Sequence, residues 1–235
     1  GYCTSLPAYK APFIFSNFNG TLADVDVLTH EAGHAFQYYL AARTLPLAES
    51  CHSTSEICEI QSMTMEHLTY PWMDKFFGDM AEKYRYAHLC NALTMIPYIV
   101  SVDEFQHRVY EKPRMTAAER KAVWREIERK YMPWRDYDGV ENMEQGGFWM
   151  QKQHIFLNPF YYIDYALAQM GAFELYGRMK TNRKEAWEDY LNLCKAGGSL
   201  GFFELLQTAR LSNPFEPGGV KKAAEHVLVE LNLFS

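Results

Sequence analysis

The feature that most constrains this chain is the pentapeptide His30-Glu31-Ala32-Gly33-His34, which lies in a segment of helical character. A helix places positions i and i+4 on one face, so the imidazoles of His30 and His34 project together and can bind one Zn²⁺. Glu31 follows directly and can reach a water on the metal without being a ligand itself. The motif predicts a zinc hydrolase site with Glu31 as its general base.

Signals for helix ends place this motif inside a long helix. Thr21-x-x-Asp24 resembles a capping box, with Asp in place of the usual Glu, and predicts a helix from there to about residue 44. Ser53-x-x-Glu56 is a second such box and predicts another helix, which Pro71 limits.

The remaining segments favour helices over strands. Residues 12–18 are aromatic and β-branched between turn signals, so we expect a short strand there, and residues 134–153 are expected to form a loop. Helices are expected over 73–112, with a break or kink at Pro97, and over 116–131, 159–180, 183–195, 199–209 and 218–233. The predicted fold is mainly α, in one domain over residues 1–235, with one short strand segment near the N-terminus.

Composition excludes several classes of partner. The net charge of −6 argues against nucleic acid or an anionic membrane, because either would favour a clustered Lys/Arg surface. No apolar run reaches the roughly 18 residues that a membrane span needs. The five cysteines are scattered and form no Cys-x-x-Cys pair, which is typical of free thiols in a reducing compartment and predicts a cytoplasmic location.

A catalytic zinc usually has three protein ligands and one open position, so a third ligand must come from another segment. The helix after the second capping box offers Glu56, Glu59 and Glu66. Glu56 is expected to bond back to Ser53 within its own cap. Glu59 is one turn further along and can face the first helix, so Glu59 is the preferred third ligand.

The spacing of these residues resembles a known family. His30-Glu31-x-x-His34 is followed after 25 residues by Glu59-x-x-Ser62-x-x-x-Glu66, and this arrangement is similar to the M3 family of zinc oligopeptidases, in its oligoendopeptidase F branch. The stretches Phe13–Gly20 and His154–Tyr165 resemble that family too. The resemblance implies a zincin-type catalytic domain with one Zn²⁺. Because members are about twice as long, it also implies that residues 1–235 are the C-terminal half of a longer protein.

The resemblance further implies roles for residues far downstream of the motif. By their place in it, His154 and Tyr165 would polarise the scissile carbonyl and stabilise the oxyanion, with Tyr161 or Tyr162 as a second tyrosine. One more residue separates His154 from Tyr165 than this branch leads us to expect, so the choice between Tyr161 and Tyr162 stays open. A phenol or an imidazole N–H can donate to a developing oxyanion.

The sequence therefore predicts a zinc-dependent endopeptidase that cleaves internal bonds of short peptides, with the missing N-terminal half completing the substrate channel. One alternative is a half that binds metal or peptide without turnover. Another is a ferritin-like di-iron bundle, suggested by two Glu-x-x-His pairs, Glu31/His34 and Glu104/His107. These patterns specify neither a cleavage preference nor an oligomeric state.

Overall fold

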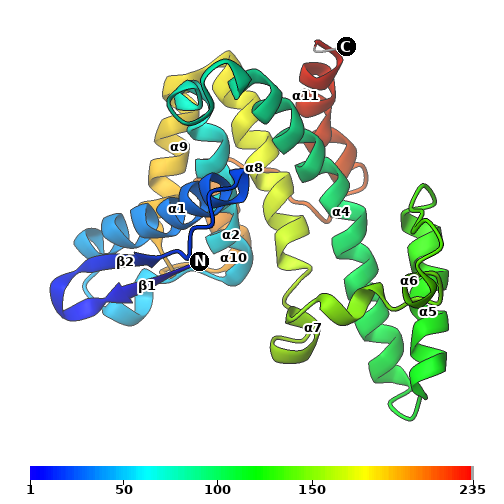
Figure 1. Ribbon diagram of the computed structural model, residues 1–235. Coiled ribbons are helices and arrows are strands. Elements are labelled where there is room, and N and C mark those ends of the chain that lie inside the picture. Colours follow the sequence, from blue (N-terminus) through cyan, green and yellow to red (C-terminus); the bar gives the residue numbers. More distant parts are fainter. Residues whose placement is uncertain (234–235) are drawn as a thin grey trace. The chain divides into compact units, whose positions relative to one another are not determined.

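The structure is a computed structural model that describes residues 1–233, and in this range it consists of helices and one hairpin (Figure 1). The strands are β1 (Tyr2–Leu6) and β2 (Ala11–Phe15). The helices are α1 (Leu22–Thr44), α2 (Ser55–Leu68), α3 (Asp74–Phe77), α4 (Ala81–Glu111), α5 (Ala117–Tyr131), α6 (Glu141–Glu144), α7 (His154–Leu157), α8 (Asp164–Thr181), α9 (Arg183–Ala196), α10 (Phe202–Thr208) and α11 (Gly219–Leu233). No helix in this range is long and apolar enough to cross a membrane.

The chain divides into two compact units. The first comprises residues 1–90 together with the chain from residue 167 onward, and the second comprises residues 91–166. The chain passes between the units within α4 and within α8. A single catalytic domain over residues 1–235 stays a prediction.

An antiparallel hairpin opens the first unit. The expected strand is present as β2, and β1, which the sequence pattern did not reveal, pairs with it in a register that sets Tyr2 opposite Phe15 and Leu6 opposite Ala11. Side chains alternate between the two faces of a strand, so these residues share one face, which is largely exposed. The other face lies toward α1 (Figure 1).

The start of α1 follows the sequence prediction. The carboxylate of Asp24 accepts the backbone N–H of Thr21 at 3.1 Å and those of Asn19 and Gly20 at 3.0 and 2.6 Å. These are donors that precede or open a helix without a helical partner, so the carboxylate fixes where α1 begins. With its start fixed at Leu22, α1 carries the whole His30–His34 motif within its interior.

The start of α2 corrects a prediction. The expected box of Ser53 and Glu56 does not form, because the N-cap is Thr54, and the Ser53 hydroxyl contacts the thiol of Cys58 at 3.3 Å instead. The expected loop over residues 134–153 likewise contains the short helix α6 and a 3₁₀ turn at Phe148–Gln151. At the start of α5, within the helix expected over 116–131, Thr116 and Glu119 form a capping box.

The core of the first unit fixes the orientation of α2. Its buried side chains come from α2, α8, α9 and α10, and they include Ile57, Ile60, Leu175, Tyr190, Leu193, Leu205 and Leu206. Burying one such aliphatic side chain contributes about 1.5–3 kcal/mol. The Tyr190 hydroxyl also donates to the Gln61 carbonyl at 2.9 Å, which ties α9 to α2. Apolar packing and this contact with α9 therefore orient α2, and the Gln61 side chain adds a hydrogen bond to the Leu193 carbonyl at 3.2 Å.

The second unit is built around α4 and α5. Its core comprises Tyr98, Ile99, Val102, Phe105, Trp124, Ile127, Met132, Trp149, Tyr162 and Ala166. Pro97 does not end α4: the helix continues through it, and the Ser101 hydroxyl donates to the Pro97 carbonyl at 2.8 Å.

Candidate metal centre and aromatic cluster

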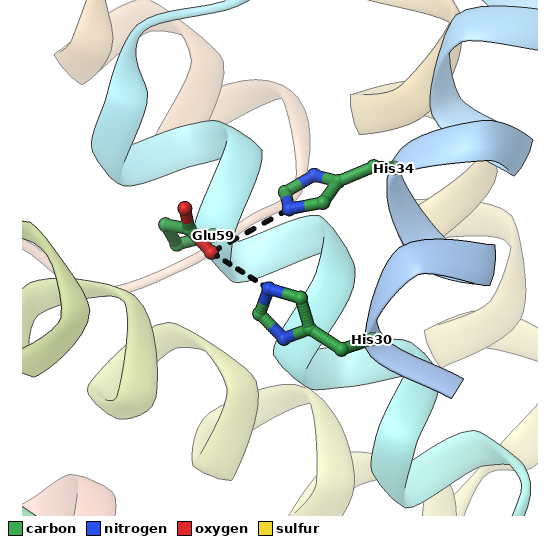
Figure 2. A group of neighbouring side chains, drawn as sticks. All are labelled: His30, His34 and Glu59. Carbon is green, nitrogen blue, oxygen red and sulfur yellow. Dashed lines mark ion pairs between the residues drawn. The ribbon is translucent and has the colours of Figure 1, made fainter. Parts of the chain in front are cut away.

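Two helices of the first unit bring together three side chains of the types that can bind a metal. His30 and His34 project from α1 and Glu59 projects from α2, and Figure 2 shows the three pointing toward one another. The Glu59 Oε2 atom lies 3.2 Å from His30 Nε2 and 3.6 Å from His34 Nε2. The structure thus places the three predicted ligands in one group, called the metal group below.

The spacing of these donor atoms suits a zinc ion. Two ligand atoms at zinc–ligand distances of 2.0–2.2 Å in a tetrahedron are roughly 3.4 Å apart. The two measured distances, 3.2 and 3.6 Å, bracket that value, and all three donor atoms lie within 4.8 Å of one another. Two imidazoles and one carboxylate are a donor set typical of catalytic zinc. In the part of the chain that the structure describes, this is the one group of three or more such side chains that gathers in this way.

Gly33 allows the two helices to approach closely enough for this geometry. A Cβ atom at this position would lie 2.5 Å from the Cα of Ser62 and 2.9 Å from the carbonyl oxygen of Gln61. Both contacts are with the α2 backbone, which cannot move aside as a flexible side chain would. The lack of a side chain at Gly33 therefore leaves room for the close approach of α1 and α2.

Glu31 lies on α1 beside the ligands and is buried. Burial, the largest influence, raises the pKa of its carboxyl group, while the charge of His30 and a backbone hydrogen bond from Cys3 of β1 lower it. A carboxylate with a raised pKa is a better proton acceptor at neutral pH. Glu31 therefore combines a raised pKa with a position beside the three side chains and a contact with the hairpin.

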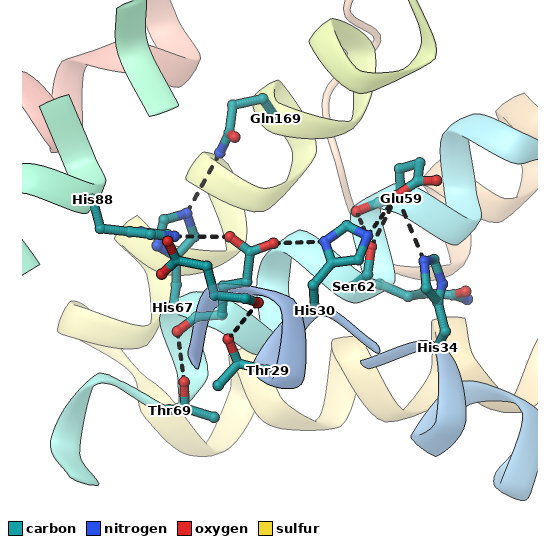
Figure 3. A network of polar contacts seen from close by, with 12 residues as sticks. Thr29, His30, His34, Glu59, Ser62, His67, Thr69, His88 and Gln169 are labelled. Carbon is teal, nitrogen blue, oxygen red and sulfur yellow. Dashed lines mark hydrogen bonds and ion pairs between the residues drawn. The ribbon is translucent and has the colours of Figure 1, made fainter. Parts of the chain in front are cut away.

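A second carboxylate supports His30 from the far side of its ring. The Nδ1 atom of His30 lies 2.7 Å from Glu66 Oε1, and the other oxygen of Glu66 lies 2.9 Å from Nε2 of His88 in α4 (Figure 3). From the sequence, Glu66 is only one of three candidate ligands on its helix, and His88 carries no signal of a role. The signal for Glu66 was its distance of seven residues from Glu59, which is two helical turns and hence the same face.

These contacts and burial shift the pKa values of His30, Glu66 and His34 in different directions. Burial opposes the charge on His30, but the hydrogen bonds that its ring donates to Glu59 and Glu66 outweigh burial and raise the His30 pKa to about 10. Burial also disfavours the charged form of Glu66, yet the bonds from His30 and His88 bring its pKa down to about 2. For His34, burial prevails and lowers the pKa to about 4. His34 is thus held as a neutral imidazole, the form that binds a metal.

In the second unit, the four residues predicted to act downstream form one aromatic cluster. The ring of His154 is 6.0 Å from the ring of Tyr161, 5.0 Å from Tyr162 and 5.9 Å from Tyr165, measured between centroids. Tyr165 also meets both other tyrosines edge-on, at 5.4 and 5.3 Å. The structure therefore groups around one imidazole the side chains to which the family resemblance gives a shared role.

A left-handed turn builds this cluster. The sequence predicts a helix from residue 159, but α8 begins at Asp164, because Phe160 has φ = 64° and cannot continue a right-handed helix. The Phe160 ring lies 4.9 Å from the ring of His107 and 4.9 Å from that of Tyr110, and its N–H donates to Gln106 at 2.9 Å. The turn lies between α7, which begins at His154, and the three tyrosines whose rings contact the His154 ring.

Tyr161 and Tyr162 differ in their surroundings. Tyr162 is 3% exposed, packs in the core of the second unit, and its hydroxyl receives a hydrogen bond from the Lys152 ammonium at 2.9 Å. Burial raises the Tyr162 pKa and lowers that of Lys152. Tyr161 is only partly buried and stacks nearly parallel to His154, with 8° between the ring planes. The core position of Tyr162 favours Tyr161 as the second tyrosine.

Glu104 and His107, the second Glu-x-x-His pair, contact other side chains and not each other's metal-binding atoms. The Glu104 carboxylate accepts hydrogen bonds from Lys130 at 2.8 Å and from Tyr131 at 2.6 Å, and exposed His107 pairs with Asp103 at 3.4 Å. Within residues 1–233, Glu104 and His107 are in no metal-binding group. This pairing removes the structural basis for a di-iron bundle.

Comparisons with known proteins agree with the geometry. An oligoendopeptidase F homologue from Borreliella burgdorferi is 27% identical over 197 residues, which are 80% of this chain and 32% of that protein. The solved structure of Pz peptidase A with an inhibitor is 55% identical with a TM-score of 0.94, and the match covers 99% of this chain and 41% of the other. A candidate oligoendopeptidase F from Bacillus anthracis strain Ames is 49% identical with a TM-score of 0.84, covering 99% and 38%.

The chain therefore spans about a third of the curated relative and about two fifths of these solved chains. The mainly α, zincin-type fold expected from the sequence is confirmed by these structures. The family model of peptidase family M3 matches residues 1–225, from the hairpin through the metal group and the aromatic cluster into α11. On that match, and on the HExxH helix with its glutamate 25 residues later, the chain belongs to peptidase family M3.

Proposed function

We propose that this chain is the catalytic domain of a zinc-dependent endopeptidase that hydrolyses internal bonds of short peptides. The observation that carries the proposal is the convergence of His30, His34 and Glu59 at donor spacings that suit one zinc ion. Family membership supports peptide hydrolysis, and the names of the relatives, an oligoendopeptidase F homologue and Pz peptidase A, support short peptides as substrates.

When bound, zinc supplies a Lewis acid that polarises the scissile carbonyl and lowers the pKa of water to about 7. The residues of the chain do the rest. Glu31 accepts a proton from the attacking water and passes it to the leaving amine. His154 and Tyr165, assisted by Tyr161, donate hydrogen bonds to the developing oxyanion. Donors of this kind contribute about 3–4 kcal/mol each in other hydrolases.

The partial coverage of the relatives extends the proposal. We infer that residues outside this chain supply the other wall of the substrate channel, so that size selection requires the full-length protein. A series of peptides of rising length tests this point. Cleavage that stops above a certain length supports the channel, whereas equal cleavage of short peptides and of an unfolded protein contradicts it.

A cytoplasmic location is proposed from the cysteines. None of the five forms a disulfide within the described residues; Cys51 and Cys194 are buried, and the other three are half-buried. Free thiols in this number suit a reducing compartment. Fractionation of the source cells, with the full-length protein detected by antibody, tests the location; recovery outside the cytoplasm contradicts it.

The main test replaces the general base. Glu31→Gln in the full-length protein should lower kcat for a quenched fluorescent peptide by about a thousandfold or more, because the amide cannot accept the proton. Zinc content should stay at one ion per chain, since Glu31 is not a ligand. The matched control is Glu49→Gln, at an exposed glutamate away from the group, which should leave kcat unchanged. Unchanged cleavage in Glu31→Gln would refute the mechanism.

An alternative is that the protein binds metal and peptide without turnover. The same assay separates the two functions. A wild-type protein that binds zinc and protects a peptide from other proteases, but releases no product, would favour the alternative. Product release that depends on Glu31 favours the peptidase.

A further inference from the structure

We propose that Glu66 is a positioning residue of the metal group, which fixes the tautomer and the ring orientation of His30, and that His88 holds Glu66 in place for this task. This inference rests on the proposed zinc function. Its evidence is the row of contacts from Tyr70 through His88 and Glu66 to His30, none of which involves the metal-facing atom of His30.

The tautomer follows from the donors and acceptors available. An ionised carboxylate only accepts hydrogen bonds, so at 2.7 Å from Glu66 Oε1 the Nδ1 atom of His30 must carry the hydrogen. Metal binding displaces the other ring proton, and the lone pair then lies on Nε2, the atom that is 3.2 Å from Glu59 and faces the other ligands. Glu66 thus selects the form of His30 that can bind a metal through Nε2.

Glu66 itself is held from behind. Its second oxygen accepts from Nε2 of His88 at 2.9 Å, and Nδ1 of His88 lies 2.6 Å from the hydroxyl of Tyr70. The ring of Tyr84 stacks on that of His88 at 5.7 Å between centroids, while its hydroxyl donates to Asp26 at 2.5 Å. The His88 side chain is 8% exposed and that of Glu66 15%, so solvent does little to screen the contact.

The side chains of His30, Glu66 and His88 come from three different helices, so their contacts depend on the tertiary fold and not on one local segment. His30 lies on α1, Glu66 on α2 and His88 on α4, so each hydrogen bond crosses from one helix to the next (Figure 3). His34, in contrast, pairs with Glu59 at 3.6 Å on the side that faces the other ligands. The support is therefore directed at His30.

The test measures zinc binding to the full-length protein by competition with a chelator, and it compares two glutamate-to-glutamine variants of α2. Glu66→Gln keeps the shape but presents an amide N–H₂ to one of the two histidines, and should weaken zinc binding about 10- to 100-fold. Glu56→Gln, at a half-exposed position of the same helix, should leave it unchanged. Equal zinc affinity in Glu66→Gln and wild type overturns the inference.

A second variant and a spectroscopic readout separate positioning from folding. His88→Phe keeps a ring in the aromatic stack but removes the donor to Glu66, and should weaken zinc binding by a smaller factor than Glu66→Gln. In the wild type, the His30 Nδ1–H proton should give a downfield NMR resonance that is lost or shifted in Glu66→Gln. An unmoved resonance, or loss of zinc only in proportion to a lower melting temperature of the metal-free protein, contradicts the proposal.

The outcomes also distinguish this inference from the function it rests on. If the wild-type protein binds no zinc, the proposed function fails and the NMR resonance alone decides whether Glu66 fixes His30. If the wild type binds zinc and cleaves peptide while Glu66→Gln matches it in both, only the inference fails.

Discussion

The metal group and the aromatic cluster are assembled by different kinds of backbone. The metal group uses the interiors of two long helices, and each ligand is set by its place in the helical repeat. The aromatic cluster uses the four-residue helix α7, a left-handed turn and the first turn of α8. The difference shows that one site depends on how closely two helices approach, whereas the other depends on the torsion angles of a single turn.

The largest expected effect comes from disturbing the helix approach. Gly33→Val should lower the free energy of unfolding by about 3 kcal/mol, because its Cβ would meet the α2 backbone at 2.5 Å. Zinc affinity should fall with it, since moving α2 moves Glu59 away from His30. Urea unfolding and chelator competition measure the two effects. The control Ala23→Val, at an exposed position of α1, should cost less than about 0.7 kcal/mol.

If Gly33→Val instead kept full zinc affinity, the metal group would tolerate helix separation. The metal group would then not depend on how closely α1 and α2 approach, contrary to the comparison above.

The next effect compares the two adjacent tyrosines of the cluster. Tyr161→Phe should lower kcat about 100-fold with zinc content unchanged, as expected for loss of one oxyanion donor. Tyr162→Phe should lower the free energy of unfolding by about 1 kcal/mol, because the buried Lys152 ammonium loses its acceptor, and should change kcat little. Steady-state kinetics and urea unfolding of both variants make the comparison. The reverse pattern would assign the catalytic role to Tyr162.

The smallest effect tests the turn itself. Phe160→Val and Phe160→Asn both remove the ring that packs on His107 and Tyr110, but asparagine tolerates a left-handed backbone and valine does not. Valine should therefore cost about 1–2 kcal/mol more than asparagine in urea unfolding. It should also lower kcat further, with zinc affinity equal in the two. Identical stability and kcat would show that the torsion at this position does not organise the cluster.

The sequence predicted the metal group well because helices are regular. The spacing of His30 and His34 fixes their common face, and a glutamate 25 residues later falls on the neighbouring helix at the facing position. A glycine inside a helix also indicates close packing or function, and the structure gives Gly33 such a packing role. The role of His88 was hidden, because nothing local to α4 shows that it points toward Glu66.

The sequence was less informative where structure depends on turns. β1 escaped notice because its inward side chains, Cys3 and Ser5, are too small and polar to give an apolar alternation. Phe160 read as part of a helix because aromatic residues rarely adopt positive φ, and only its contacts in the fold hold it there. The second capping box failed because α2 begins one residue later than expected, with Thr54 at the N-cap position and without a capping hydrogen bond from its side chain.

The closeness of α1 and α2 at Gly33 has a consequence for suppressor genetics. The atoms that a side chain at this position would strike belong chiefly to the backbone of Ser62 and Gln61, and no substitution at those positions removes a Cα or a carbonyl oxygen. A damaging replacement of Gly33 should therefore have no simple compensating change across the interface. A selection for revertants is expected to return glycine at the original site, whereas replacements that strike flexible side chains should yield suppressors elsewhere.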